Sequence, residues 1–312
     1  MIKKIDTVIL GGGLTGIASA YHISRALPDE ETLIVEKSRF LGGLCRSVVK
    51  DGFTYDYSGH LLHLRKDQTR RWVFDLLKNN LREVERDSRI FSEGRLVRYP
   101  YQMNLYGLPP ATIKECIRGV VESHLRGNTP DASGSFLKWS KDIFGAGITR
   151  HFMKPYNEKL FRCSARKFNA EWCGGFVPRP SVEETIIGAL SDNASRGVGY
   201  NATFFYPKNG GIQSLVRAII EKLPRNVSKR TEMWAEDIDL GSQNITFSDG
   251  NIIKFRRLVS TIPLPDFAGI CGMKKISEKL RSISVVCFNI GVRGNAGHNI
   301  HWIYFPEKKF DF

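Results

Sequence analysis

Three glycines near the start of the chain have the spacing of a phosphate-binding turn. Residues 11–16 are Gly-Gly-Gly-Leu-Thr-Gly, which matches the pattern G-x-G-x-x-G. In such a turn Gly11 permits the tight bend, Gly13 lets backbone N–H groups approach a pyrophosphate, and Gly16 lets the next helix pack closely. Glu36 stands twenty residues after Gly16, where a carboxylate can accept hydrogen bonds from ribose hydroxyls. The spacing therefore predicts a dinucleotide site.

A second glycine pair follows the acidic residue. Residues 39–43 are Arg-Phe-Leu-Gly-Gly, whereas sites for NAD usually end their motif at the acidic residue. An R-x-x-G-G run here resembles the second phosphate-contacting loop of FAD-binding amine oxidases and glutathione-reductase-like flavoproteins. No second G-x-G-x-x-G is present, so reduction by the substrate, a partner or a docking NAD(P)H all stay open. We expect FAD, bound by Gly11, Gly13, Leu14, Thr15, Gly16, Glu36, Lys37, Arg39, Gly42, Gly43 and Leu44.

The elements that must position these residues form a βαβ unit. The apolar run 5–10 predicts a buried parallel strand, the spacing over 14–26 predicts a helix, and 32–35 predicts a second buried strand. The stretch 107–200 is mostly helical in pattern and holds no second βαβ unit, which indicates an inserted domain.

Short strands dominate the last third of the chain. A helix is expected from 210 to 223, followed by a β-meander over 238–255. A buried strand is predicted at 258–262, and two more at 283–292 and 299–305. Because the last strand has no returning partner in the sequence, we expect the chain to be cut short of its natural domain end.

These patterns predict an α/β fold: a Rossmann-like, glutathione-reductase-like FAD-binding domain with an inserted substrate domain of helices and β-sheet. The expected division is 1–95 for the first part of the FAD-binding domain, 96–205 for the mainly helical substrate domain, 206–270 for the second FAD-binding part, and 271–312 for substrate-domain strands.

Composition excludes several classes. With 42% hydrophobic and 25% charged residues among 312, the chain is globular and not intrinsically disordered. The net charge of +14 favours an anionic partner, which could be a phosphorylated small molecule, a nucleotide, nucleic acid or a membrane surface. The basic residues are dispersed along the chain, which disfavours a dedicated nucleic-acid-binding arm. The six cysteines form no CxxC and no metal-like cluster with histidine, so no metal is expected and a reduced, cytoplasmic chain is predicted. No apolar run is long enough to span a membrane, and the oligomeric state stays open.

Three further stretches carry distinctive motifs. Residues 52–60 are Gly-Phe-Thr-Tyr-Asp-Tyr-Ser-Gly-His, residues 99–105 are Tyr-Pro-Tyr-Gln-Met-Asn-Leu, and residues 152–159 are Phe-Met-Lys-Pro-Tyr-Asn-Glu-Lys. These motifs resemble those of UDP-galactopyranose mutases, occur in that family's order, and belong to a likeness that runs over nearly the whole chain. The dinucleotide motif is less specific, because protoporphyrinogen oxidases and amine oxidases share it.

The resemblance implies an unusual use of FAD. It implies isomerisation of a UDP-sugar through a reduced-flavin N5 adduct, without net redox change, for cell-surface glycan synthesis in the cell wall or lipopolysaccharide. By motif match, Gly59 and His60 belong to a catalytic loop that faces the flavin. Met233 falls on the meander strand whose backbone contacts adenine in this fold class.

The resemblance also implies a set of substrate contacts. Tyr99 and Gln102 fall on uridine-contact positions. Phe176 stands where the family has a diphosphate-binding arginine, so Arg179, nearest in sequence, is our candidate for the replacement cation. The remaining expected substrate contacts are Asn157, Phe161 (tryptophan in the family), Asn201 and Tyr304.

Two alternatives stay open. The first is an FAD-dependent oxidoreductase of the amine oxidase or protoporphyrinogen oxidase type, which keeps the FAD motifs and is favoured by the altered arginine position. The second is a flavin-binding protein without catalysis of its own that acts through a partner.

Overall fold

The predicted βαβ unit is present in the computed structural model. It consists of strand β1 (Lys3–Leu10), helix α1 (Leu14–Ala26) and strand β2 (Thr32–Val35). The two strands pair in parallel, with Val8 opposite Leu33. Side chains on both faces of β1 are buried, which explains why the strand is a continuous apolar run.

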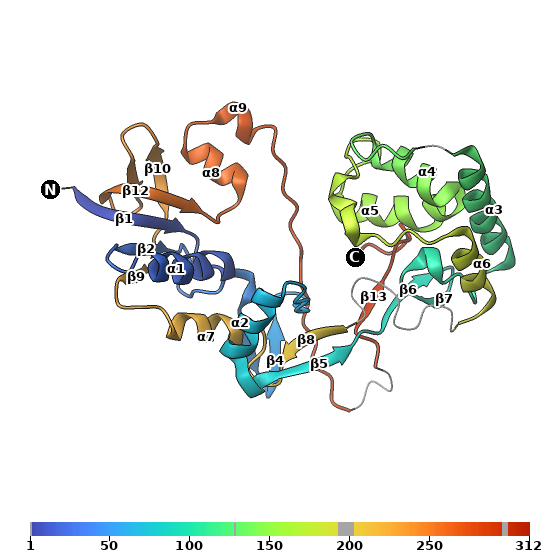
Figure 1. Cartoon of the computed structure of the whole chain (residues 1–312), viewed down its shortest axis with the longest axis horizontal. Coiled ribbons are helices and arrows are strands. Elements are labelled where there is room, and N and C mark those ends of the chain that lie inside the picture. Colours follow the sequence, from blue (N-terminus) through green and yellow to red (C-terminus); the bar gives the residue numbers. More distant parts are fainter. Residues whose placement is uncertain (1, 128, 193–202, 295–298) are drawn as a thin grey trace. The chain divides into compact units, whose positions relative to one another are not determined.

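The structure describes residues 2–127, 129–192, 203–294 and 299–312, which form two units (Figure 1). The units divide at other residues than the predicted boundaries, because residues 85–95 group with the second unit and 271–292 with the first. The first unit contains Met1–Val84 and Phe205–Val292, and the second contains Glu85–Phe204 and Arg293–Phe312.

A six-stranded sheet in the order β10-β11-β12-β1-β2-β9 organises the first unit. Helices α1, α2 (Asp67–Leu77) and α7 (Gln213–Glu221) supply one apolar core against it. Its other strands are β9 (Val227–Arg230), β10 (Ala235–Asp239), β11 (Asn244–Phe247) and β12 (Ile252–Ser260).

Strand β12 corrects the predicted break between the meander and the strand at 258–262. It is one continuous strand, because it pairs antiparallel with β11 and parallel with β1, where Leu258 lies opposite Val8. The first unit also contains the two-stranded sheet of β3 (Ser47–Lys50) and β4 (Phe53–Asp56), and helices α8 (Leu264–Ile270) and α9 (Lys274–Ser277).

The predicted strand at 283–292 is not formed. This segment has no regular secondary structure, and its apolar side chains are exposed, Phe288 by 84%. The segment pairs with no strand of the described chain, although Asn289 donates a hydrogen bond to the backbone carbonyl of Asp56. Apolar, β-branched composition alone therefore did not make a strand here.

The second unit combines a small sheet with helices. Strands β6 (Ser88–Ser92) and β7 (Arg95–Arg98) form an antiparallel hairpin, and β13 (Trp302–Tyr304) pairs in parallel with β6. The last strand therefore has a partner, contrary to the expectation of an unpaired edge. The helices are α3 (Pro110–Arg126), α4 (Phe136–Ile148), α5 (Lys154–Phe161) and α6 (Val182–Leu190).

Strands β5 (Leu81–Glu85) and β8 (Thr203–Pro207) pair with each other where the chain passes from one unit to the other. The sequence patterns did not predict these two short strands. Among the described helices, none has both the length and the apolar character needed to cross a membrane.

Glycines let helices α3 and α4 approach closely. A Cβ built on Gly119 would lie 2.9 Å from the backbone nitrogen of Ala146, and one on Gly147 would overlap the carbonyl oxygen of Glu115. Gly145 and Gly147 therefore serve helix packing. This agrees with the absence of a second nucleotide motif there.

We expect Gly147→Ala to destabilise the second unit. Alanine favours a helix over glycine by about 1 kcal/mol, but the new methyl meets backbone that cannot rotate away, and such overpacking costs about 1–3 kcal/mol or more. Thermal unfolding would show a lower Tm. Gly269→Ala in α8 is the control, because its Cβ would lie 3.9 Å from the nearest atom, Ser277 Oγ. Equal Tm values for the two variants would contradict this packing account.

Candidate functional site

The glycine turn between β1 and α1 leaves a helix N-terminus open to an anion. Gly11 has a φ of +99°, which glycine tolerates best, and a Cβ on Gly16 would overlap the Gly11 carbonyl oxygen. Gly13 caps α1 without a side-chain hydrogen bond, and the first helical turn holds no acidic residue. The backbone N–H groups of that turn and the helix dipole therefore favour a phosphate there.

Gly13 is the one glycine of residues 11–16 at which an added Cβ would meet no clash. A Cβ at Gly13 would find its nearest atom, Gly43 Cα, at 3.9 Å, whereas one at Gly12 would overlap Leu41. The second glycine loop lies against the first, because Gly42 donates a backbone hydrogen bond of 2.7 Å to the Gly12 carbonyl. Both predicted phosphate loops are thus brought together by the fold.

Glu36 follows β2 and is buried, with 8% of its surface exposed. Its carboxylate accepts hydrogen bonds of 2.8 Å from the backbone N–H groups of Gly12 and Ser38. These bonds hold the side chain beside the glycine turn and leave further lone pairs on both oxygens. Glu36 can therefore accept ribose hydroxyls while it supports the turn.

The other predicted cofactor residues have varied surroundings. Thr15, Lys37, Arg39 and Leu44 are exposed, and Leu14 is half-buried. Met233 differs from the prediction, because it lies in the loop before β10 and not on a strand. Its buried side chain packs in the core beneath the sheet, and its backbone N–H already donates to the Glu36 carbonyl.

The loop with Ser58, Gly59 and His60 directly follows β4. Ser58 has a φ of +79°, which is unusual for a residue with a side chain. Nδ1 of His60 lies 3.1 Å from the Ser58 carbonyl oxygen, and Gly59 is exposed. This local bond orients the imidazole from within its own loop.

An arginine among tyrosines is the most distinctive feature of the second unit. Arg86 donates a hydrogen bond of 3.0 Å to the Tyr304 hydroxyl, and its guanidinium lies 5.6 Å from the ring centroid of Tyr99. Tyr99 and Tyr304 stack, and Tyr156 meets Tyr304 edge-on. Sequence reasoning missed Arg86, because a charged residue between Glu85 and Asp87 gave no signal beyond a solvated surface.

Arg86 has no acidic partner in the part of the chain that the structure describes. Its Nε atom is buried without a hydrogen bond. Burial raises the pKa of Tyr99 to about 12 and also raises the pKa values of Tyr156 and Tyr304. The phenols therefore stay protonated at neutral pH and can donate hydrogen bonds, so this cluster offers one cation and several O–H donors to an anion.

The other predicted substrate residues differ in their exposure and packing. Gln102 is 1% exposed, donates 2.7 Å to the Pro178 carbonyl, and leaves its Oε1 without a partner. Asn157 is buried and donates 2.7 Å to the Met153 carbonyl. Phe161 packs on Phe168 and Trp172, Arg179 is exposed over the Trp139 ring, and Asn201 lies outside the described residues.

The sequence profile of flavin containing amine oxidoreductases matches residues 14–291. This match spans both units and most of the chain. The chain belongs to the flavin containing amine oxidoreductase family. Membership implies a flavin cofactor, and the glycine turn with its open helix N-terminus fits the pyrophosphate of a flavin dinucleotide.

The chain is also similar to individual proteins of known structure or curated sequence. The crystal structure of a reduced UDP-galactopyranose mutase superposes with a TM-score of 0.85 at 28% identity, over 98% of this chain and 68% of the mutase. A candidate protoporphyrinogen oxidase from Exiguobacterium sp. 255-15 shares the fold, with a TM-score of 0.65 at 20% identity over 89% of this chain and 64% of that one. Human protoporphyrinogen oxidase is 51% identical over 41 residues, which are 13% of this chain and 9% of that protein.

These likenesses show the predicted α/β, Rossmann-like flavoprotein fold and the resemblance to UDP-galactopyranose mutase. The chain spans only about a tenth of the curated oxidase it matches, because that match covers 9% of the oxidase.

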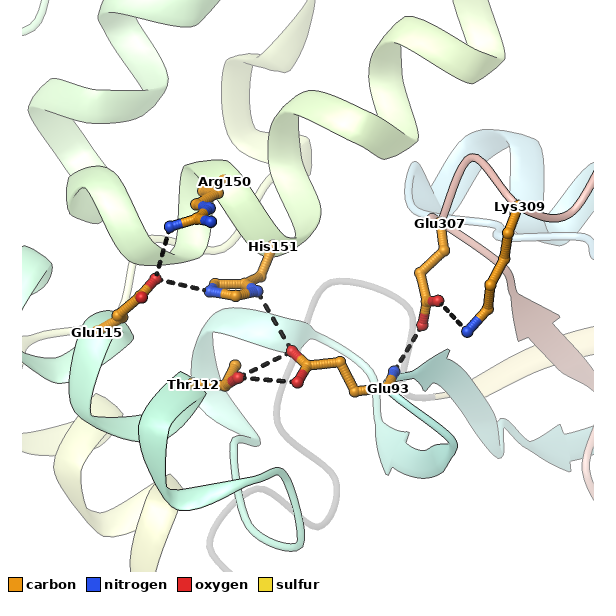
Figure 2. Close-up of polar contacts among 7 residues, drawn as sticks. All are labelled: Glu93, Thr112, Glu115, Arg150, His151, Glu307 and Lys309. Atoms are coloured by element: carbon orange, nitrogen blue, oxygen red, sulfur yellow. Dashed lines mark hydrogen bonds and ion pairs between the residues drawn. The ribbon is translucent and has the colours of Figure 1, made fainter.

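A histidine between two carboxylates ties the second unit together (Figure 2). Nε2 of His151 lies 2.9 Å from a Glu115 oxygen on α3, and Nδ1 lies 3.3 Å from a Glu93 oxygen at the β6–β7 turn. Arg150, also beside Glu115, and Thr112, which donates 2.8 Å to Glu93, complete this group.

The same group reaches the C-terminal segment. The backbone N–H of Glu93 donates 2.6 Å to the carboxylate of Glu307, which pairs with Lys309 at 2.6 Å (Figure 2). Glu307 follows Tyr304 closely in the chain, so the cluster helps hold the strand that carries this tyrosine.

We expect this cluster to give the second unit an acid-dependent stability. The hydrogen bond from His151 is the main cause that lowers the pKa of Glu115. A carboxyl with a lowered folded pKa stabilises above its unfolded value, about 4.3, and this contribution is lost as pH falls through the folded value. In His151→Gln the acid-side decline of Tm should be shallower than in the unmodified protein.

The check is a series of thermal melts between neutral pH and pH about 3, spanning the ordinary glutamate value. Arg150→Gln is the matched control, since the Arg150 side chain is 73% exposed and lies farther from Glu115, at 3.4 Å. It should change the profile less. Superimposable profiles for His151→Gln and the unmodified protein would show that the bond to Glu115 does not contribute.

Proposed function

We propose that the protein is an FAD-dependent isomerase of a UDP-sugar, similar to UDP-galactopyranose mutase, that serves cell-surface glycan synthesis. The structural likeness at 28% identity over 98% of the chain supports this proposal. The observation that carries it is the Arg86 cluster in the second unit, because its chemistry suits a nucleotide diphosphate.

A diphosphate would supply what Arg86 lacks. Arg86 is half-buried, and its Nε atom is buried without a hydrogen bond. A phosphate oxygen can accept hydrogen bonds from guanidinium and phenol groups together, and would supply the partner that this nitrogen lacks. Arg86 with Tyr304 and Tyr156 would hold the diphosphate, and the Tyr99 ring would stack on uracil. Gln102, whose Oε1 is buried without a hydrogen-bond partner, is the proposed amide contact to the uracil.

The remaining proposed roles follow the sequence motifs. Reduced FAD, when bound, would supply the covalent chemistry at the sugar, with NAD(P)H as a suitable external reductant. The two glycine loops would hold the pyrophosphate and Glu36 the ribose. Gly59 and His60 would line the flavin, and Asn157, Phe161, Arg179 and Asn201 would contact the substrate.

An oxidoreductase is the second candidate. The family profile and the short match to human protoporphyrinogen oxidase favour it. In that case a substrate would reduce the bound flavin, and the Arg86 cluster would bind a different anion.

Anaerobic flavin spectroscopy separates the two candidates. The oxidised, FAD-loaded protein is mixed with UDP-galactose, with a polyamine, or with protoporphyrinogen, and the visible absorption of the flavin is followed. We expect the flavin to stay oxidised with all three compounds. Bleaching of the flavin by the polyamine or by protoporphyrinogen would replace the isomerase proposal by the oxidoreductase.

A further inference from the structure

Both ends of the loop that contains His60 are fastened to one strand. At its start, Asp56 accepts a hydrogen bond of 2.5 Å from the Tyr206 hydroxyl on β8. At its end, Leu62 and Phe205, the neighbour of Tyr206, exchange backbone hydrogen bonds of 3.1 and 2.9 Å. Residues 57–61 therefore form a closed loop whose ends cannot move independently of β8.

The carboxylate of Asp56 accepts the hydrogen bonds that hold the start of this loop. Besides Tyr206 it accepts a hydrogen bond of 2.5 Å from the Ser47 hydroxyl and one of 3.3 Å from the backbone N–H of Ile212. A Cβ on Gly211 would overlap Ser47 Oγ and lie 2.7 Å from Asp56, so glycine is needed for this approach. Burial and the Asp56 carboxylate raise the pKa of Tyr206, which keeps its hydroxyl a donor.

Ser47 connects Asp56 to the phosphate loop. It is the first residue of β3, directly after the turn that begins with Gly42 and Gly43. Ser47 and Gln213 also exchange hydrogen bonds, of 3.1 and 3.2 Å, so Ser47 is held between β4 and the start of α7. A shift of the phosphate loop would therefore move Ser47 and change its hydrogen bond to the Asp56 carboxylate.

We propose that Asp56 is a positioning residue that couples occupation of the phosphate loops to the placement of loop 57–61. Ser47 transmits a displacement of the phosphate loop to Asp56, and the Tyr206 hydroxyl holds Asp56 at the start of loop 57–61. The inference rests on the proposed function only in taking His60 to face the flavin. It does not depend on the identity of the substrate.

Hydrogen–deuterium exchange tests this coupling without an activity assay. Exchange of residues 57–61 is measured in the apoprotein and in the FAD-loaded protein. We expect FAD to slow it at least tenfold in the unmodified chain. In Tyr206→Phe and in Ser47→Ala, FAD should still bind within about threefold of the normal Kd, but the FAD-dependent slowing should disappear.

Tyr55→Phe is the matched control, because it removes a hydroxyl one residue from Asp56 and no hydrogen bond of the Asp56 group. It should keep the slowing. A merely structural role would raise exchange equally in the apo and loaded forms of Tyr206→Phe and leave the effect of FAD intact. That result, or an FAD effect absent from the unmodified chain, would overturn the proposal.

Discussion

Gly13→Ala is expected to give a folded protein that no longer retains FAD. Gly13 has a φ of −74°, which alanine adopts freely, and its Cβ would lie 3.9 Å from the nearest atom. The methyl would instead fill the space that faces Gly43, where a phosphate must approach backbone N–H groups. Each charge-assisted hydrogen bond lost costs about 1.5–3 kcal/mol, or roughly 10- to 150-fold in Kd.

The Kd for FAD can be measured by titration of flavin fluorescence, with the Tm of the apoprotein as the check on folding. Gly269→Ala is the control and should bind FAD normally. Gly16→Ala serves as the contrasting case, because its methyl would overlap the Gly11 carbonyl and disturb the fold itself. Normal FAD affinity in Gly13→Ala would show that the cofactor does not bind at this turn.

Arg86→Ala is expected to weaken UDP binding by roughly 10- to 100-fold, the scale of one hydrogen bond to a charged group. Arg86→Lys should recover part of the affinity, since an ammonium restores the charge but not the planar pair of donors. The Kd for UDP would be measured by calorimetry on the reduced, FAD-loaded protein.

Arg89→Ala is the matched control, because that guanidinium is already paired with Asp87 at 2.6 Å. Arg179→Ala tests the cation suggested by sequence alone, whose side chain lies over Trp139. If the affinity for UDP falls only in Arg179→Ala, the diphosphate contact is assigned to Arg179 and not to Arg86. No loss in either variant would remove the support that the Arg86 cluster gives to a nucleotide diphosphate.

The βαβ unit of the dinucleotide site could be predicted almost to the residue. Strand β2 and helix α1 begin and end where the sequence predicts them. The glycine turn precedes α1 and Pro28 follows it, and the apolar residues have helical spacing in α1 but form a continuous run in β2. The prediction of a strand at 283–292 was wrong. The composition of this segment favours a strand, but strand formation needs a neighbouring strand, which local sequence does not specify.

The candidate site was only partly predictable. Glycine motifs identify a phosphate site because the backbone itself binds, so residue type and spacing suffice. Arg86 and Asp56 gave no such signal, since their significance arises from Tyr304 and Tyr206, which are 218 and 150 residues away in the chain. Such pairs become visible only when the fold is known.

The most direct test of the account is product analysis after incubation of UDP-galactose with the FAD-loaded chain. One sample is reduced with dithionite and a second is left oxidised, and the sugar nucleotides are separated by chromatography. We predict UDP-galactofuranose in the reduced sample and none in the oxidised sample. A reduced, FAD-saturated protein that binds UDP but forms no furanose product would contradict the proposed isomerisation.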